Sequence, residues 1–135
     1  MQVEFPFIRQ KANVVDFVLR PFAEVTLRYG ENEIVEWFLI DSGADVSLIS
    51  RGLGELLGFK IREGEEVKQL GGLGETKVPY LLRTLKIKIG EKEFDARVAW
   101  SLIEDVPLIL GRLDIFDKFD VSFKEKEGKV VFKFE

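Results

Sequence analysis

The sequence predicts a mainly β, compact domain that contains one or two short helices. The dominant hydrophobic period is two residues, which is typical of half-buried strands. Short Gly-containing turns separate the alternating runs, and only two stretches have a helical spacing of apolar residues. The length of 135 residues suits one domain covering 1–135, in which 1–15 are expected to form an N-terminal arm or an edge strand.

Alternation is clearest in three runs, at 22–28, 84–89 and 93–98. In each run every second residue is apolar and the residues between them are polar or charged, as in Ala-Glu-Val-Thr-Leu-Arg. A strand with one face on the core and one face in water has this pattern. The last two runs are joined by Gly-Glu-Lys at 90–92, so we expect them to pair as a hairpin.

Two further stretches predict strands of a different kind. The run 34–40 is apolar almost throughout, and we expect it to be buried on both faces. At the C-terminal end, phenylalanine and valine alternate over 119–123 and again over 130–134, separated by a Glu-Lys-Glu-Gly turn. This arrangement predicts a terminal hairpin.

The helical stretches are 50–59 and 111–119. The first begins with a candidate N-cap, Ser50, and reaches Gly58, a residue type that often ends helices. The second has closely spaced apolar residues in a short turn. The expected apolar face of the first consists of Leu53, Leu56 and Leu57.

Composition excludes several classes of function. The net charge is −4 with both signs interspersed, so no electrostatic footprint for nucleic acid is visible. The chain has no cysteine and no histidine, which removes thiolate chemistry, zinc–thiolate sites and the usual general base. We therefore expect no metal and no cofactor, and any catalysis would use carboxylates, hydroxyls, lysines or backbone groups.

Neither a leader nor a membrane span is visible. The N-terminal Met-Gln-Val-Glu-Phe-Pro-Phe-Ile-Arg-Gln-Lys lacks the long apolar region of a signal peptide. No run of about 18 apolar residues occurs, so no membrane partner is expected. These features favour a soluble, cytoplasmic protein.

The stretch Phe-Leu-Ile-Asp-Ser-Gly-Ala-Asp-Val-Ser-Leu-Ile-Ser, 38–50, places Asp41 between two apolar runs. Asp, Ser and Gly are common in turns, so this triplet alone is typical of an ordinary turn. The apolar runs on both sides favour a different interpretation, in which a strand delivers a carboxylate to the mouth of the core. Gly43 permits the tight backbone that such a loop needs, and Ser42 places a hydroxyl beside the acid.

Three motifs in order resemble the retropepsins, the aspartic proteases of retroviruses and their cellular relatives. They are Leu-Ile-Asp-Ser-Gly-Ala-Asp at 39–45, a glycine-rich Gln-Leu-Gly-Gly-Leu-Gly segment beginning at Gln69, and Pro-Leu-Ile-Leu-Gly-Arg at 107–112. The resemblance implies a retropepsin-like single-lobe acid-protease barrel with a flap hairpin. It also implies aspartic endopeptidase activity on peptide or protein substrates.

The resemblance assigns roles residue by residue. Asp41 would be catalytic, and Ser42 and Gly43 would form the active-site loop that locks two subunits together. Asp45 would pair with Arg112. The substrate-binding residues would be Gly43, Ala44, Asp45 and, in the flap, Leu70, Gly71, Gly72, Leu73 and Gly74.

The chain contains a single Asp-Ser-Gly, although aspartic proteolysis needs two carboxylates a few ångströms apart that share one proton. An enzyme of this kind would therefore be a twofold homodimer in which the two copies of Asp41 meet. The segments before Asp41 and after Arg112 are longer than in the viral enzymes, so the dimer contacts are expected to differ. Two alternatives stay open, a catalytically silent binding or assembly module with the same fold and an unrelated small β-barrel.

Other residues that attract notice have simpler interpretations. The spacing of Asp114, Asp117 and Asp120 suggests a cation site, but solvated acids on a short helix explain it better. Trp37 and Trp100 are expected in the core rather than as ligand platforms.

Overall fold

The structure, a computed structural model, describes residues 1–71 and 77–135. The elements follow one another in the order β1 (Gln2–Pro6), β2 (Ile8–Lys11), β3 (Phe17–Arg20), β4 (Phe22–Tyr29), β5 (Asn32–Ile40), β6 (Ser47–Ile49), α1 (Arg51–Leu57), β7 (Lys68–Gly71), β8 (Lys77–Ile89), β9 (Lys92–Ser101), β10 (Ile109–Leu110), β11 (Asp120–Lys124), the 3₁₀ turn η1 (Glu125–Glu127) and β12 (Lys129–Lys133). The expected mainly β class is confirmed.

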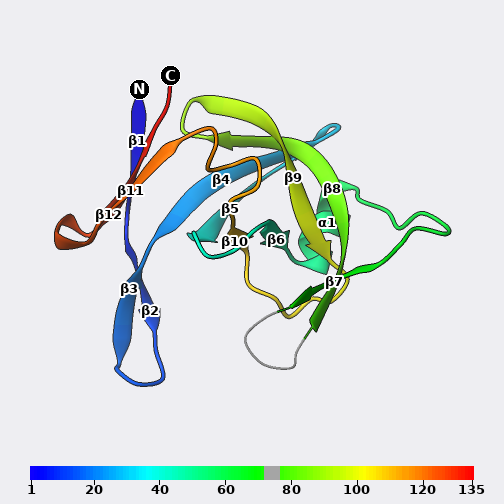
Figure 1. The fold of residues 1–135 in the computed structure, drawn as a ribbon, viewed down its shortest axis with the longest axis horizontal. Coiled ribbons are helices and arrows are strands. Elements are labelled where there is room, and N and C mark those ends of the chain that lie inside the picture. The colour runs from blue at the N-terminus through cyan, green and yellow to red at the C-terminus, as the bar shows by residue number, and fades with distance from the viewer. Residues whose placement is uncertain (72–76) are drawn as a thin grey trace.

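Six strands form a closed barrel in the order β4-β5-β10-β6-β9-β8, and β8 pairs with β4 to close it (Figure 1). The short strand β10 lies between β5, to which it is parallel, and β6, to which it is antiparallel. β7 extends the sheet beyond β8. Closure gives each wall strand a paired neighbour on both sides, although β10 pairs with only the last two residues of β5.

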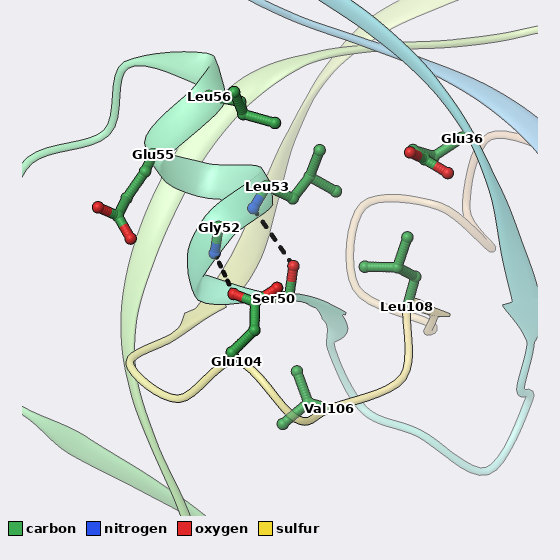
Figure 2. A pocket seen from close by; sticks show the side chains of 9 residues that line it. All are labelled: Glu36, Ser50, Gly52, Leu53, Glu55, Leu56, Glu104, Val106 and Leu108. Atoms are coloured by element: carbon green, nitrogen blue, oxygen red, sulfur yellow. Dashed lines mark hydrogen bonds between the residues drawn. The ribbon is translucent and has the colours of Figure 1, made fainter.

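Helix α1 forms where the capping residues predict it. The Ser50 hydroxyl accepts a hydrogen bond from the Leu53 amide at 3.3 Å, and Gly58 ends the helix with a φ of 99° (Figure 2). Leu53 and Leu57 are buried, as expected. Leu56 was expected on the same buried face, but 70% of it is exposed. The helix contacts the barrel through Leu53 and Leu57, and Leu56 points away from that contact.

The segment 111–119 forms a series of turns, and the helix expected there is not present. Asp114 adopts a left-handed conformation with a φ of 63°, which no α-helix accommodates. Hydrogen bonds from the amides of Ile115 and Phe116 both reach the Arg112 carbonyl and produce a tight turn instead.

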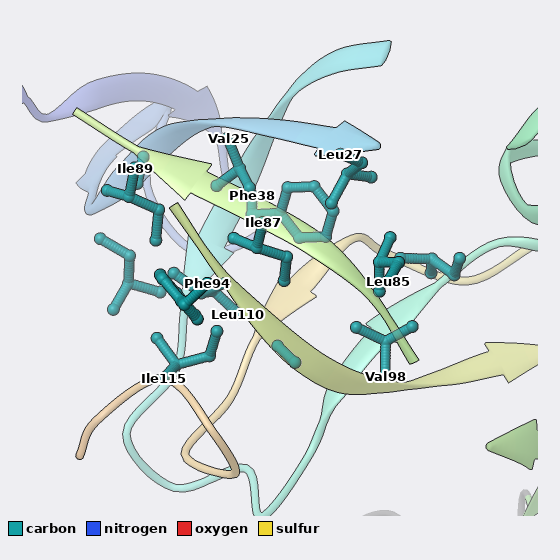
Figure 3. Packing of buried hydrophobic residues seen from close by; sticks show 14 of the residues in the cluster. Val25, Leu27, Phe38, Leu85, Ile87, Ile89, Phe94, Val98, Leu110 and Ile115 are labelled. Atoms are coloured by element: carbon teal, nitrogen blue, oxygen red, sulfur yellow. The ribbon is translucent and has the colours of Figure 1, made fainter. Parts of the chain in front are cut away.

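The barrel interior is filled by the alternating apolar residues of β4, β8 and β9 (Figure 3). Burying each of these side chains contributes about 1–3 kcal/mol relative to exposure. The pattern of every second residue predicted these positions correctly. They are Ala23, Val25 and Leu27 on β4, Leu85, Ile87 and Ile89 on β8, and Phe94, Ala96 and Val98 on β9.

Strand β5 departs from the expectation that both of its faces are buried. Val35 is 53% exposed and Trp37 is 41% exposed, so the outer face of β5 is only partly covered. Trp37 stands edge-on to Phe5 of β1, with ring centroids 6.1 Å apart. Trp100, in contrast, is buried as predicted, and its indole donates to the Arg51 carbonyl at 3.1 Å.

The ends of the chain form a second, three-stranded sheet in the order β1-β12-β11. The expected C-terminal hairpin is therefore present as β11 and β12, and the N-terminal β1 lies along its β12 side. After β1 the chain forms a separate two-stranded hairpin, β2–β3, that stands away from the barrel (Figure 1). None of the helices in the described ranges has the length and hydrophobicity that crossing a bilayer requires.

Candidate active site

Asp41 occupies the first position after β5, at the end of a wall strand. Its amide donates to the Leu110 carbonyl of β10 at 3.0 Å, and its carbonyl accepts from the Ala44 amide at 3.1 Å. The side chain is also held, because the Gly43 amide donates to Asp41 Oδ1 at 2.9 Å. These three bonds fix both the backbone and the carboxylate of a half-buried acid.

The backbone at Gly111 packs directly against the loop that follows Asp41, and no space is left there for a side chain. A Cβ at position 111 would stand 2.5 Å from the Val46 carbonyl oxygen and 3.0 Å from that of Ala44. The Gly111 amide donates to the hydroxyl of Ser47 at 2.9 Å, and Ser47 is only 1% exposed. Only glycine fits here, and the buried Ser47 satisfies its amide.

Two more backbone hydrogen bonds join the loops. The Arg112 amide donates to the Ala44 carbonyl and the Leu113 amide to the Asp45 carbonyl, each at 2.9 Å. The segments 44–47 and 111–113 thus form one rigid unit beside Asp41. Ser47 was missed by the sequence reasoning, since a serine inside an apolar strand carries no signal that its partner is a distant glycine.

The Arg112 guanidinium contacts the same unit. It donates to the Ser42 carbonyl at 3.3 Å and lies over the ring of Phe116, 5.0 Å from the centroid. In the described part of this single chain, no ion pair joins Arg112 to Asp45, and the two residues are connected through the backbone of their loops.

Asp41 opens onto a cleft of about 680 Å³ between the Asp41 loop, the β7–β8 hairpin and the segment before β10. The walls are mostly apolar, and Asp41, Asp45 and Asp105 are the charged residues among those that line it. A carboxylate held at an apolar concave surface can activate a bound water and engage a polar substrate group.

The cleft unites several of the predicted residues but not all. Asp41, Gly43, Ala44, Asp45, Leu70 and Gly71 line it. Ser42 and Arg112 are not among the residues that line the cleft. The predicted flap-tip residues Gly72, Leu73 and Gly74 lie outside the described residues.

The remaining residues of the cleft were not predicted. They are Val46, Leu48, Val78, Ile103, Asp105, Val106, Pro107 and Ile109. The motif at 107–112 could have indicated Pro107 and Ile109, which belong to it. Nothing in the sequence marks Asp105, because a charged residue in a loop is ordinary.

An ion pair anchors the base of the β7–β8 hairpin. Glu65, in the loop that leads to β7, accepts two hydrogen bonds from the guanidinium of Arg83 on β8, at 2.5 and 2.8 Å. Arg83 is 6% exposed and also donates to the Lys60 carbonyl at 2.8 Å. The hydrogen bonds from Arg83 lower the pKa of Glu65 to about 2. The loop that leads into this hairpin and the strand that leaves it are thus tied together.

The three aspartates that suggested a cation site are engaged elsewhere or solvated. Asp114 accepts from the Arg97 guanidinium at 2.8 and 3.0 Å, and this pairing lowers the pKa of Asp114 to about 2. Asp117 pairs with Lys118 at 2.9 Å, and Asp120 is exposed at the start of β11. Across 1–71 and 77–135, no group of three acidic side chains has the arrangement of a metal site.

Comparisons with known proteins agree with this geometry. The chain has the fold of a retropepsin-like aspartic protease from Rickettsia conorii, with a TM-score of 0.68 and 17% identity over 99% of this chain and 92% of that one. The EIAV protease, solved with the inhibitor HBY-793, is 26% identical, with a TM-score of 0.51 over 73% of this chain and 86% of that one. No curated protein sequence matches.

A family model described as aspartyl protease matches residues 24–112, which run from β4 through the Asp41 loop to Gly111 and Arg112. The match thus spans both loops that the hydrogen bonds join. This chain belongs to the aspartyl protease family.

Proposed function

We propose that this chain is an aspartic endopeptidase that acts as a twofold homodimer, in which Asp41 of each copy forms half of the catalytic pair. The observation that carries the proposal is the position of Asp41, a carboxylate fixed by the Gly43 amide at the mouth of an apolar cleft. The family match and the single Asp-Ser-Gly in 135 residues support it, since one copy supplies only one acid.

The chemistry follows from placing two carboxylates together. Like charges a few ångströms apart cannot both ionise readily, so the pair holds one proton. The ionised carboxylate takes a proton from water as its oxygen attacks the scissile carbonyl carbon, and the protonated carboxyl donates to the carbonyl oxygen. Breakdown of the tetrahedral diol returns a proton to the amine that leaves. The pKa values of such a pair belong to both acids jointly.

The neighbours of Asp41 would bind the extended peptide. Ser42 would link the two active-site loops across the twofold axis, and the Gly43 carbonyl would accept from the substrate backbone. Ala44 and Asp45 would contact the next residues of the peptide, with Asp45 also pairing with Arg112 in the assembled enzyme. The segment from Leu70 to Gly74 would act as the flap that closes over the peptide and moves to admit it.

Part of the dimer contact would come from the terminal sheet. Strand β11 is at its edge, with only β12 beside it, and Phe123 on this strand is 39% exposed. An exposed edge with an aromatic residue is suited to pairing with a second copy. The N-terminal segment would belong to the same domain as an arm and edge strand.

The test is the loss of turnover in Asp41→Asn with the fold retained. A denatured polypeptide is incubated with wild-type protein and with this variant, and cleavage is followed by mass spectrometry. Asp95→Asn is the matched control, because Asp95 is an exposed carboxylate on β9 outside the cleft. Cleavage by wild type and the control but not by Asp41→Asn supports the proposal. Equal cleavage by all three proteins would refute it, and a folded wild type that cleaves nothing would favour the silent binding module.

A further inference from the structure

A second pocket lies beside α1 and has a volume of about 650 Å³ (Figure 2). Its apolar lining comes from Leu53, Leu56, Val106 and Leu108, and its charged lining is entirely acidic: Glu36, Glu55 and Glu104. Figure 2 shows the Glu36 side chain across the pocket from Leu53 and Leu56. A fitting occupant would therefore combine apolar side chains with positive charge.

The β2–β3 hairpin has this composition. Lys11 pairs with Phe17 and Arg9 pairs with Leu19, so one face of the hairpin presents two cations and two large apolar side chains. Phe17 is 49% exposed and Leu19 is 60% exposed. The Arg9 guanidinium lies 3.6 Å from the centroid of the Phe17 ring.

The hairpin also lacks a layer to pack against. Its two strands pair only with each other among the sheets of the described residues. A two-stranded hairpin alone in water is marginally stable, and packing of one face on another surface is what usually stabilises it. The exposed apolar face of β2–β3 is therefore expected to be covered in the working protein.

The hairpin of one chain lies apart from α1 of the same chain. Figure 1 shows β2–β3 projecting from one side of the molecule, whereas α1 lies on the opposite side of the barrel. A second copy supplies both surfaces without this restriction. A twofold pair would form the contact twice, hairpin to pocket and pocket to hairpin, which is the rule for isologous interfaces.

We infer that the β2–β3 hairpin of each copy docks into the acidic pocket beside α1 of the second copy. The apolar side chains of Phe17 and Leu19 cover Leu56 and its neighbours, while Arg9 and Lys11 face the glutamates. Charge complementarity selects this partner, because the docking face of the hairpin carries Arg9 and Lys11 in a chain whose net charge is −4. The inference rests on the homodimer of the proposed function.

Docking there would connect the partner copy to the catalytic cleft. Val106 lines both the pocket beside α1 and the cleft that Asp41 faces. The segment 104–108 is thus a thin wall between the two spaces. A hairpin seated in the pocket would support this wall from behind, so the partner would shape the substrate site at a second place, away from the paired acids.

The first experiment tests the contact by disulfide cross-linking. The chain has no cysteine of its own, so a disulfide can form only between the two thiols that are introduced. Leu19→Cys and Leu56→Cys proteins are mixed and oxidised, and disulfide-linked dimers are identified on non-reducing gels and by mass spectrometry. The control mixture pairs Leu19→Cys with Leu82→Cys, an exposed leucine on β8 outside the pocket. The inference predicts rapid linkage in the first mixture and little in the second. Equal linkage in both mixtures would overturn it.

The second experiment exchanges the charges. Sedimentation should show that Arg9→Glu combined with Lys11→Glu weakens dimerisation by about 10-fold or more, and that the loss shrinks with added salt. Adding Glu36→Lys to this variant should restore much of the affinity. Unchanged dimerisation in the Arg9→Glu, Lys11→Glu protein would contradict the inference.

The two proposals fail in distinguishable ways. A dimeric wild type that cleaves peptide, with neither selective linkage nor a charge effect, would overturn the hairpin contact and leave the protease intact. A wild type that sediments as a monomer at every concentration and shows no linkage would overturn both. Selective linkage in a dimer that cleaves nothing would support the contact and count against the protease.

Discussion

The Gly43 amide and the Asp41 carboxylate form a closed local unit, with the amide nitrogen 2.9 Å from Oδ1. A Cβ at position 43 would lie 3.2 Å from the same oxygen, so glycine leaves the carboxylate in this position without a close contact to a side chain. The acid is oriented before any substrate or second subunit arrives. Such preorganisation is what a catalytic carboxylate requires.

Gly43→Ala should therefore reduce turnover while leaving the fold intact. The added methyl group displaces the carboxylate by a few tenths of an ångström and crowds the position of the peptide. We expect kcat to fall by about 10- to 100-fold, because small misplacements of catalytic groups are costly. Steady-state kinetics measure this effect, and thermal unfolding serves as the control. Wild-type kcat in a well-folded Gly43→Ala protein would contradict the role given to this contact.

Gly111→Ala should destabilise the protein strongly. Its Cβ would overlap the Val46 carbonyl at 2.5 Å, and a backbone atom cannot swing aside. We expect a loss of about 1–3 kcal/mol or more in the free energy of unfolding. Gly71→Ala is the control for stability, because a Cβ at 71 meets nothing within 4 Å. Denaturant unfolding of both variants measures the difference, and equal stability would show that the two loops are not packed as described.

The ion pair between Glu65 and Arg83 should make stability depend on pH in a defined window. The pKa of Glu65 is lowered to about 2 in the folded chain, from an ordinary value of 4.5. A lowered pKa means that the stabilisation is complete above the ordinary value and is lost as the pH falls toward about 2. Glu65→Gln should thus be less stable than wild type near pH 6, and the gap should close in strong acid.

Unfolding experiments between pH 2 and 6 measure this gap, at pH values chosen around the two pKa values. Glu63→Gln is the matched control, since Glu63 is an exposed glutamate of the same loop. A gap between wild type and Glu65→Gln that stays constant across the range would contradict the assignment.

Asp114 combines an ion pair with an unusual backbone, and two substitutions separate these contributions. Asn tolerates the left-handed conformation at a φ of 63°, whereas Ala does not. Asp114→Asn should lose the ion pair with Arg97 and keep an acceptor for the Arg97 amide, which donates to Asp114 Oδ2 at 2.9 Å. Asp114→Ala loses that acceptor as well as the tolerated conformation, and should be less stable than Asp114→Asn by at least about 1 kcal/mol. Chemical denaturation of both proteins gives the comparison. Equal stability of the two variants would mean that the backbone strain is negligible.

Much of the barrel could be predicted because its strands have one buried face. Alternation alone located β4, β8 and β9, and capping chemistry located α1. Strand β5 shows the limit of this reasoning. A continuous apolar run does not reveal whether a second layer covers it, so the exposure of Trp37 depends on tertiary structure that the pattern does not contain.

The site illustrates the same limit over longer distances. The Asp41 motif can be recognised from consecutive residues. Leu110, whose carbonyl accepts from the Asp41 amide, belongs instead to β10, a strand from much later in the chain that lies between β5 and β6. Residue spacing carries no information about that insertion, and only the resemblance to a family indicated it. No sequence motif marks the β2–β3 hairpin or the pocket beside α1. Both features depend on which surfaces of the folded chain stay exposed, and residue patterns do not show this.

We propose that one Asp41 becomes catalytic only when a second copy supplies its partner. Activity per chain is therefore measured as a function of protein concentration, with the dimer fraction determined in parallel by sedimentation. Activity should follow the dimer fraction and vanish on dilution to monomer. Constant activity per chain throughout the monomeric range would contradict the pairing of two Asp41 carboxylates.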